Sequence, residues 1–462
     1  MPEFKIAERR HSNYGKNLKR WNLFGDSYVG GQKYISNEDY LFSHKLEKHD
    51  YYKDRLKAAY YFNYCRPVVR TLNNFLFQET ITRDFKGIII DAQIDAYKKL
   101  MRIASLRTSI YGDVYGVVDA PKLTDEEKAK RDSGKLTKRD TNKYNPIIKL
   151  VNPQDFVDCS VDSNGNYNWV ILRERISNDE DPHAEREDLE RFRLWLRDGW
   201  ELYDGDSKFI TSDYHSLGEV PVVRVMNIDA DADSVGESTL EDIAYVNRDI
   251  YNDCSLLGEL IKKQTFSQLV AQGNATDYDG HLMSTSSIFT YPKGVNEPKY
   301  ISPDAGQAEL IIRKIERSIA EIYRLAELRI SGREGRNQQY KSIAENVYDF
   351  SSTNVALKNK AAVMTSFELE ILRLAAKWRG MNVQPVIQYP SEFDVTTLEQ
   401  ELADALTIET LGMGKTFERM IKMRIANKKF PDMSEKDKKQ IEAEIMDDAE
   451  LNTNQIPDDP NL

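Results

Sequence analysis

The feature that most constrains this chain is a pair of long helical segments on either side of a loop-rich insert, between residues 236 and 330. Ser238 and Glu241 form the S-x-x-E pattern of a helix start. The insert contains three glycines and three prolines, and the second helix is expected to begin after Ser302-Pro303-Asp304. One globular core seldom needs two long helices that hold out such a module, whereas a ring built from paired helices does.

Each helical segment carries an apolar stripe at the three-, four- and seven-residue spacing of a helix. Charged residues interleave with both stripes, so only one side of each helix is suited to burial. The residues that we expect to pack are Ile243, Ile250, Leu257 and Ile261 in the first helix and Ile311, Ile315, Ile319 and Ile322 in the second.

Composition sets broad limits on what the chain is. Of its 462 residues, 40% are hydrophobic and 30% are charged, which is typical of a soluble protein with ample core. Three distant cysteines give neither a disulfide framework nor a metal-ligand spacing. The polar N-terminus and the lack of a long apolar run predict no secretory signal and no membrane insertion. The net charge of −11 argues against nonspecific wrapping of nucleic acid by the whole surface.

The first half of the chain changes from helical to strand periodicity. Residues 1–50 predict an irregular arm with one short helix. Residues 51–78 are helical in pattern, and Pro67 predicts a kink or a division into two helices. A helix is expected at 94–111, and residues 112–225 predict a mostly antiparallel sheet with hairpin turns at Asn164-Gly165 and Asp198-Gly199.

The second half is mostly helical in pattern, so the whole chain is predicted to be α+β. We expect a loop to about residue 340, a helical piece at 341–348 and a firm helix at 354–379. A strand at 386–389 is bracketed by two prolines, which suits a sheet edge. Three C-terminal helices (396–411, 415–427 and 434–448) and a disordered tail complete the prediction.

Two segments resemble ligand-binding motifs but depart from them in detail. Asp229, Asp231 and Asp233 alternate as in a calcium loop, yet Ser234 replaces the required glycine and Leu240 the bidentate glutamate, which favours a solvated loop before a helix. The glycines at 332 and 335 lack the following Lys-Ser/Thr of a phosphate loop, which favours a flexible loop with exposed arginines.

No catalytic constellation stands out elsewhere. No two of the six histidines have helical metal spacing, and the sequence contains no G-x-S-x-G, H-E-x-x-H or C-x-x-C motif. The lysine- and arginine-rich stretches at 122–139 and 415–429 are interpreted as solvated surfaces, the second with the alternative of pairing with the acidic 435–450 segment of a neighbouring subunit. We therefore expect no enzyme activity, no cofactor and no metal site.

The order of several weak motifs, taken together, resembles one protein family. These are Tyr60-Tyr61-Phe62-Asn63-Tyr64, the run from His215 to Val223, Gly236-Glu237-Ser238-Thr239-Leu240, Asn247 with Tyr251-Asn252, and Gln264-Thr265-Phe266 before the insert. Over about residues 51–380 the chain resembles the portal, or head-to-tail connector, proteins of tailed bacteriophages. The resemblance implies a ring of subunits, usually twelve, at one capsid vertex.

The resemblance also implies a map of the chain. Residues 1–50 would form an N-terminal arm, 51–235 and 353–394 the wing, 236–270 and 305–330 the stem helices, 271–304 a small clip, 331–352 the tunnel-loop region, 395–450 the crown and 451–462 the tail. Clip candidates are Tyr278, His281, Phe289 and Tyr291. Candidates for contact with DNA in the channel are Arg333, Arg336 and Lys341.

The implied function is a channel for packaging and ejection of double-stranded DNA in the virion, after assembly in the host cytoplasm. The implied partners are further copies of the chain, the terminase large subunit, capsid and scaffold proteins, and neck or tail adaptors. An acidic passage would repel the duplex and avoid the many phosphate contacts that make binding tight. Two alternatives stay open: a metal-dependent nucleic-acid enzyme that uses clustered acids, and a non-viral oligomeric adaptor.

Overall fold

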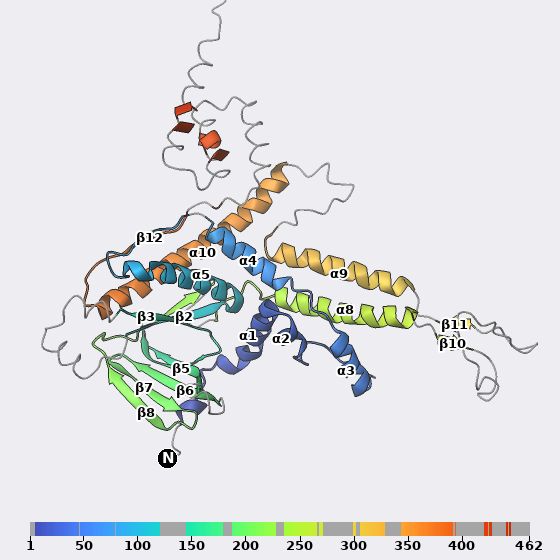
Figure 1. Cartoon of the computed structure of the whole chain (residues 1–462), viewed down its shortest axis with the longest axis horizontal. Helices are drawn as coiled ribbons and strands as arrows, with labels where there is room; N and C mark the ends of the chain where they lie inside the picture. Colours follow the sequence, from blue (N-terminus) through green and yellow to red (C-terminus); the bar gives the residue numbers. More distant parts are fainter. Residues whose placement is uncertain are drawn as a thin grey trace, which may run out of the picture. The chain divides into compact units, whose positions relative to one another are not determined.

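The computed structural model describes the chain in several stretches, and the account below concerns these residues. They are 5–45, 47–78, 80–120, 145–178, 187–227, 235–265, 268–270, 299–301, 305–328, 343–390, 393, 420–423, 425–426, 440–441 and 443–444. The chain forms two compact units, one of Met1–Glu345 with Val355–Phe393 and the other of Asn346–Asn354 with Asp394–Leu462. The first unit contains all four of the described sheets and most of the described helices (Figure 1).

The N-terminal residues form part of the core of the first unit. After η1 (Ile6–Glu8) come α1 (Tyr14–Val29) and α2 (Gln32–Ile35), and the side chains of Trp21, Phe24 and Tyr34 are buried. The prediction of an irregular arm is therefore wrong. Gly25, which interrupts the sequence pattern, gives room to the ring of Tyr111, whose hydroxyl would lie 2.8 Å from any Cβ at this position.

The helical stretch predicted at 51–78 is divided into two helices, which is one of the two outcomes predicted from Pro67. α3 (His49–Ala58) and α4 (Cys65–Leu76) are separated by a non-helical segment. Pro67 lies in the first turn of α4, where its missing N–H would have no helical partner in any case. The separating segment carries Tyr61, whose ring stacks on Tyr34 with 3.8 Å between centroids.

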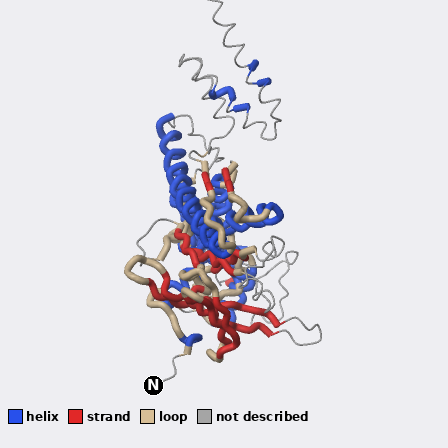
Figure 2. Tube along the Cα trace, turned by 90° about the vertical axis from the view of Figure 1, so that its left-hand side faces the viewer, coloured by secondary structure: helices blue, strands red, loops and turns tan. Residues whose placement is uncertain are grey.

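The predicted antiparallel sheet region is confirmed and consists of two sheets. The larger has the order β4–β5–β6–β7–β8 and the smaller β3–β2–β9, and η2 (Asp91–Gln93) and α5 (Ile94–Tyr111) precede β2. Figure 2 shows these strands gathered in one part of the molecule. The strands are β2 (Asp113–Asp119), β3 (Ile147–Val151), β4 (Phe156–Val161), β5 (Tyr167–Asn178), β6 (Glu187–Leu196), β7 (Gly199–Asp204), β8 (Phe209–Tyr214) and β9 (Val222–Met226).

Local turn chemistry and aromatic packing explain why these strands pair as they do. Gly165, at the predicted hairpin turn, has a φ of +82°, which glycine adopts without steric cost. Between the two sheets, the ring of Tyr115 on β2 stacks on Phe156 of β4 with centroids 3.8 Å apart. A shared core of Tyr115, Trp195 and Trp200 therefore joins the small sheet to the large one.

The helix after the glycine-rich loop is longer than predicted. α10 (Ile343–Trp378) is one helix of 36 residues, in place of the separate helices expected at 341–348 and 354–379. The correction follows from the sequence between them, which contains no glycine or proline to stop a helix. The predicted edge strand is confirmed as β12 (Val386–Gln388), which pairs antiparallel with β1 (Thr82–Asp84) in a two-stranded sheet.

Besides residues 346–354 of α10, the described residues of the second unit are short helical pieces at 420–423, 425–426, 440–441 and 443–444. These pieces fall within two of the three predicted C-terminal helices. The helix predicted at 396–411 and the predicted tail lie outside the described residues. Among the described helices, none is both apolar and long enough to cross a bilayer.

Candidate functional site: two paired helices

The two helices that flank the insert lie side by side (Figure 1). They are α8 (Ile243–Thr265) and α9 (Ala305–Leu325), and the antiparallel strands β10 (Gln268–Val270) and β11 (Lys299–Ile301) continue them at one end. α8 lies within the predicted range 236–270 but begins seven residues later and ends five residues earlier, and α9 begins at the predicted residue 305 and ends five residues before 330. The clip candidates Tyr278, His281, Phe289 and Tyr291 lie outside the described residues.

The start of α8 corrects one detail of the sequence interpretation. The helix begins at Ile243, so Ser238 and Glu241 do not form a capping box at its first turn. The Ser238 hydroxyl instead donates to the Ile110 carbonyl at 2.6 Å, at the C-terminal end of α5. Its oxygen accepts from the Leu240 amide at 2.9 Å. Ser238 therefore joins the start of α8 to the end of α5, where helix carbonyls lack helical partners.

A close backbone contact fixes the same junction. Gly112 has a φ of +84°, and a Cβ at this position would lie 2.0 Å from the Gly236 carbonyl oxygen. The buried carboxylate of Asp113 accepts from the Gly236 amide at 2.7 Å and from Arg224 Nε at 2.9 Å. The ion pair on β2 and β9 therefore also holds the chain that leads into α8.

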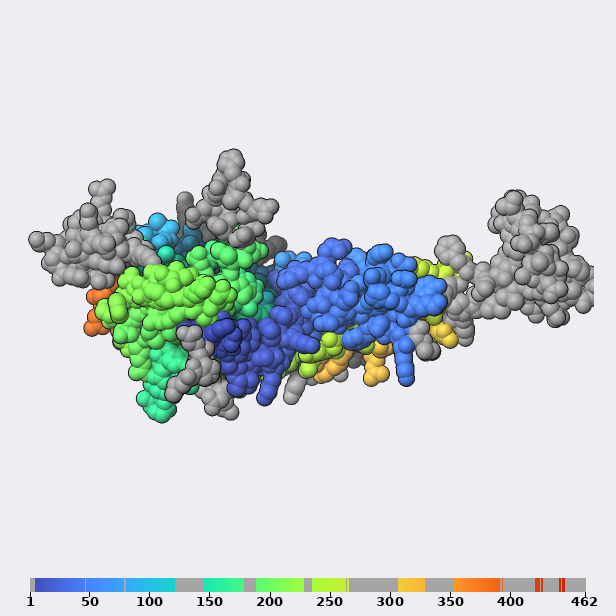
Figure 3. Space-filling view, turned by 90° about the horizontal axis from the view of Figure 1, so that it is seen from below, coloured from blue at the N-terminus to red at the C-terminus, as the bar shows by residue number. Residues whose placement is uncertain are grey.

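Two buried asparagines of α8 bind the backbone of the N-terminal segments. Asn247 accepts from the Tyr64 amide and donates to the Phe62 carbonyl, both at 3.0 Å. Asn252 accepts from the Phe42 amide at 2.8 Å and donates to the Tyr40 carbonyl at 3.0 Å. A buried amide that satisfies two backbone groups fixes its neighbours strongly, because losing it leaves both groups without a partner. The N-terminal segments therefore support α8 along one side (Figure 3).

The predicted apolar stripes pack at the supported end of the helix pair. Ile243, Ile250 and Ile322 are buried in the main core cluster, and Ile315 and Ile319 pack against it. Leu257 and Ile311 are half-buried, whereas the Ile261 side chain is 50% exposed. The stripe is thus covered near the sheets and increasingly exposed toward the insert.

Besides the apolar packing, a cluster of charged side chains joins α8 to α9. Lys314 Nζ on α9 lies 2.8 Å from a carboxylate oxygen of Asp249 and of Asp253 on α8. Desolvation opposes the charged lysine, but the hydrogen bonds from Asp249 and Asp253 outweigh it and raise the pKa of Lys314. The pairing fixes the register of α9 along α8.

Beyond the supported end, large apolar side chains face solvent. On α9, Leu310 is 67% exposed and Ile312 is 44% exposed; on α8, Ile261 is 50% exposed. Leu310 and Ile312 are two residues apart and so lie on different sides of α9. Exposed apolar side chains on two sides of one helix can be covered by more than one neighbouring chain.

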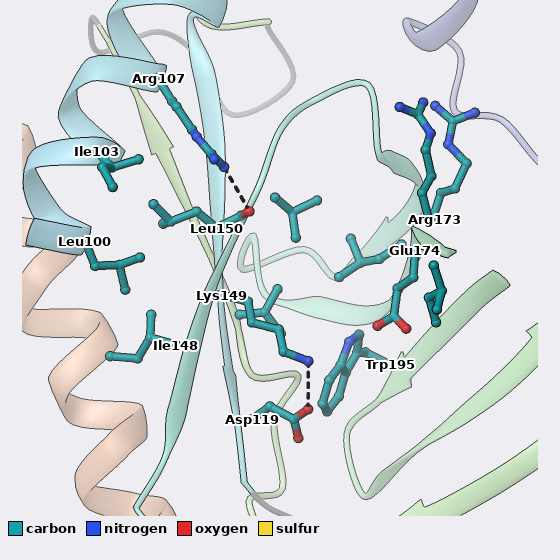
Figure 4. Close-up of a pocket in the computed structure, with 15 residues that line it drawn as sticks. Leu100, Ile103, Arg107, Asp119, Ile148, Lys149, Leu150, Arg173, Glu174 and Trp195 are labelled. Carbon is teal, nitrogen blue, oxygen red and sulfur yellow. Dashed lines mark hydrogen bonds and ion pairs between the residues drawn. The ribbon is translucent and has the colours of Figure 1, made fainter. Parts of the chain in front are cut away.

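A groove of about 590 Å³ lies between α5 and strands of both sheets (Figure 4). Leu100 and Ile103 line one side and Trp195 another. Several of its charged groups are paired: Lys149 Nζ is 3.8 Å from Asp119, and Glu174 accepts from Arg193 at 2.7 Å. Arg107 donates to the Leu150 carbonyl at 3.2 Å. Burial raises the pKa of Asp119. Because most of these polar groups are held by partners within the chain, the groove fits a packing surface better than a catalytic centre.

The remaining predicted site residues are not brought together by the described part of the chain. Arg333, Arg336 and Lys341 lie outside it. Within the described residues, no group of three or more His, Cys, Asp or Glu side chains is arranged to hold a metal ion. The bracing role of Asn247 and Asn252 was not predicted from the sequence, where the two residues stood out only as part of the motif order.

Comparison with known proteins gives similarity at the level of solved structures only. No protein-family model and no curated protein matches the chain. One similar chain comes from the neck of an empty GTA particle computed with C6 symmetry, at 11% identity and a TM-score of 0.36, covering 74% of this chain and 85% of that one. Another comes from the neck of a native GTA particle computed with C12 symmetry, at 10% identity and a TM-score of 0.36, covering 74% and 84%.

Proposed function

We propose that this chain is a non-enzymatic subunit of a head-to-tail connector that self-associates into a ring through α8 and α9. The observation that carries the proposal is the helix pair itself, which is braced at one end and exposes Ile261, Leu310 and Ile312 in the half nearer the insert. A ring would cover these side chains with the same elements of neighbouring copies. The motif order in the sequence, which resembles portal proteins, supports the same interpretation.

In this proposal α8 and α9 are the stem, and residues 271–304 are the clip that meets a packaging motor and later the neck. Residues 331–352, with Arg333, Arg336 and Lys341, would face DNA in the channel. The wing, crown and virion location follow from the resemblance in the same way, as does a subunit number of twelve. Assembly multiplies the net charge of −11, so the ring surface would on balance repel DNA and hold it only at a few basic points.

A matched pair of substitutions tests whether the exposed end of the helix pair drives self-association. Ile261→Asp puts a charge on that end, and we expect it to weaken assembly of the full-length chain in mass photometry. Ile210→Asp is the control, because Ile210 on β8 is 43% exposed and lies outside the helix pair. Equal assembly of both variants would refute the role given to α8 and α9.

A DNA readout tests the second half of the proposal. Replacing Arg333 and Arg336 with glutamine removes two cations from the proposed channel loop. We expect intact assemblies with impaired packaging or retention of DNA. Failure to assemble together with normal DNA handling would contradict the role given to this loop.

A further inference from the structure

An arginine held between two exposed aromatic rings forms a surface that the stem packing does not use. The Cζ atom of Arg248 on α8 lies 5.1 Å from the ring centroid of Phe42 and 5.1 Å from that of Tyr245. Phe42 is 52% exposed and Tyr245 is 41% exposed. We call these three residues the arginine–aromatic surface.

This surface is held in place from beneath. The Phe42 amide donates to Asn252, and the Phe42 carbonyl accepts from Arg55 Nη2 at 2.6 Å. Arg55 is buried and donates to both carboxylate oxygens of Glu47, at 2.9 and 2.8 Å. Binding at such a surface costs little ordering entropy, because buried groups already fix the backbone that carries the exposed ring.

The charge of Arg248 indicates what the surface binds. Among the residues that the structure describes, no carboxylate forms an ion pair with Arg248. A guanidinium stacked on aromatic rings keeps its N–H edge available for a carboxylate. The surface is therefore suited to a segment that combines an apolar side chain with acidic ones.

The chain carries such a segment on α9. Glu309, Ile312 and Glu316 are spaced by three and four residues, so they share one side of the helix. Ile312 is 44% exposed, and the Glu309 side chain is 72% exposed and forms a solvent-exposed ion pair with Arg313 at 3.5 Å, which is weak enough to exchange for another cation. The three residues present an apolar centre between two acidic positions.

The α9 of the same chain contacts a different side of α8. It pairs through Lys314 with Asp249 and Asp253, and Arg248 lies about 100° and about 140° around the helix from these two positions. A contact between the arginine–aromatic surface and the Glu309–Ile312–Glu316 side therefore requires another copy.

We propose that the arginine–aromatic surface receives the Glu309–Ile312–Glu316 side of α9 from a second copy of this chain. The inference rests on the proposed self-association and assigns to it one specific pair of surfaces. Because the two surfaces differ, the contact is head-to-tail, and repetition of such a contact closes into a ring when the rotation allows it.

Charge exchange tests this pairing in the full-length chain. Arg248→Glu alone, and Glu309→Arg with Glu316→Arg, are each expected to weaken self-association about tenfold or more in sedimentation velocity, since each places like charges in contact. Mixing the two variants creates opposite charges at every contact, so we expect assembly to return to near the wild-type level. Lys57→Glu is the control, because Lys57 on α3 is 78% exposed and outside both surfaces.

The outcomes separate this inference from the proposed function. Rescue on mixing also shows that both variants are folded. If the wild type assembles and Arg248→Glu assembles equally well, the pairing is wrong while self-association stands. Loss of assembly in both variants without rescue on mixing overturns the pairing as well. A wild type that stays monomeric overturns the proposed function and the inference together.

Discussion

Asn247 of α8 accepts a hydrogen bond from the backbone amide of Tyr64 at 3.0 Å, and so ties the helix to the non-helical segment before α4. The same side chain donates to the Phe62 carbonyl at 3.0 Å and is fully buried. One residue thus satisfies two backbone groups of a segment that has no helical or strand hydrogen bonds of its own.

Asn247→Leu is expected to destabilise the fold. The substitution removes the side-chain partner of the part-buried Tyr64 amide and Phe62 carbonyl, which costs about 1–3 kcal/mol of unfolding free energy. Urea denaturation followed by circular dichroism measures the loss. Gln307→Leu, at an exposed position of α9, should change stability by only about 0.5 kcal/mol or less. Equal effects of the two substitutions would contradict the bracing role of Asn247.

We expect any side chain at Gly112 to destabilise the fold, because Gly112 lies against the segment that leads into α8. Gly112→Ala and Gly165→Ala both place alanine at a positive φ, so each carries a backbone cost of about 1 kcal/mol. Only Gly112→Ala also forces a Cβ to within 2.0 Å of the Gly236 carbonyl, whereas nothing lies within 4 Å at Gly165. Thermal unfolding should show a clearly larger fall in Tm for Gly112→Ala, and similar falls would refute the close approach.

Glu219 gives a prediction for the dependence of stability on pH. Hydrogen bonds from Arg373 and Lys377 lower the pKa of this carboxyl from 4.5 to about 2. Because the folded-state pKa is depressed, the stabilisation is complete above about pH 4.5 and is lost as the pH falls toward 2.

Comparing Glu219→Gln with the wild type tests whether the contribution of Glu219 to stability falls as the pH falls. At pH 7 we expect the variant to be about 1–2 kcal/mol less stable in urea, a figure reduced from the full pKa shift because the side chain is one-third exposed. The difference should shrink at pH 3. Asp54→Asn, at an exposed pair on α3, should show little difference at either pH. If the stability difference between the wild type and Glu219→Gln is larger at pH 3 than at pH 7, Glu219 does not have the lowered pKa given above.

A buried ion pair should show strong coupling between its two members. Glu368 on α10 is fully buried and accepts from Arg83 at 2.7 Å and from the Tyr389 hydroxyl at 2.5 Å. Arg83→Met leaves a buried carboxylate without its cation and is expected to cost about 3–5 kcal/mol. Adding Glu368→Gln removes the charge and should restore part of the loss. A double-mutant cycle in urea measures the coupling, and additive effects would contradict it.

Long periodic elements were predictable from the sequence because their pattern and their packing agree. The helix expected at 94–111 has these bounds in the structure, and the Asn164-Gly165 turn connects two strands as predicted. α1 was not predictable, because lysines and two glycines dilute its pattern and its burial depends on distant partners such as Tyr111.

The same distinction applies to the two candidate surfaces: one could be predicted from the sequence and the other could not. The stripe of α8 and α9 follows from helical spacing alone. The arginine–aromatic surface does not, because Phe42 reaches Arg248 only when Asn252 and Arg55 hold its backbone in place. Contacts between residues about two hundred positions apart depend on the tertiary fold, and no local pattern in the sequence marks them.

The central claim is that this chain assembles into a closed ring through its paired helices. Negative-stain electron microscopy of the purified full-length chain at micromolar concentration tests it most directly. The account predicts annular particles with rotational symmetry and a central hole wide enough for duplex DNA. A homogeneous population of single subunits at that concentration would contradict it.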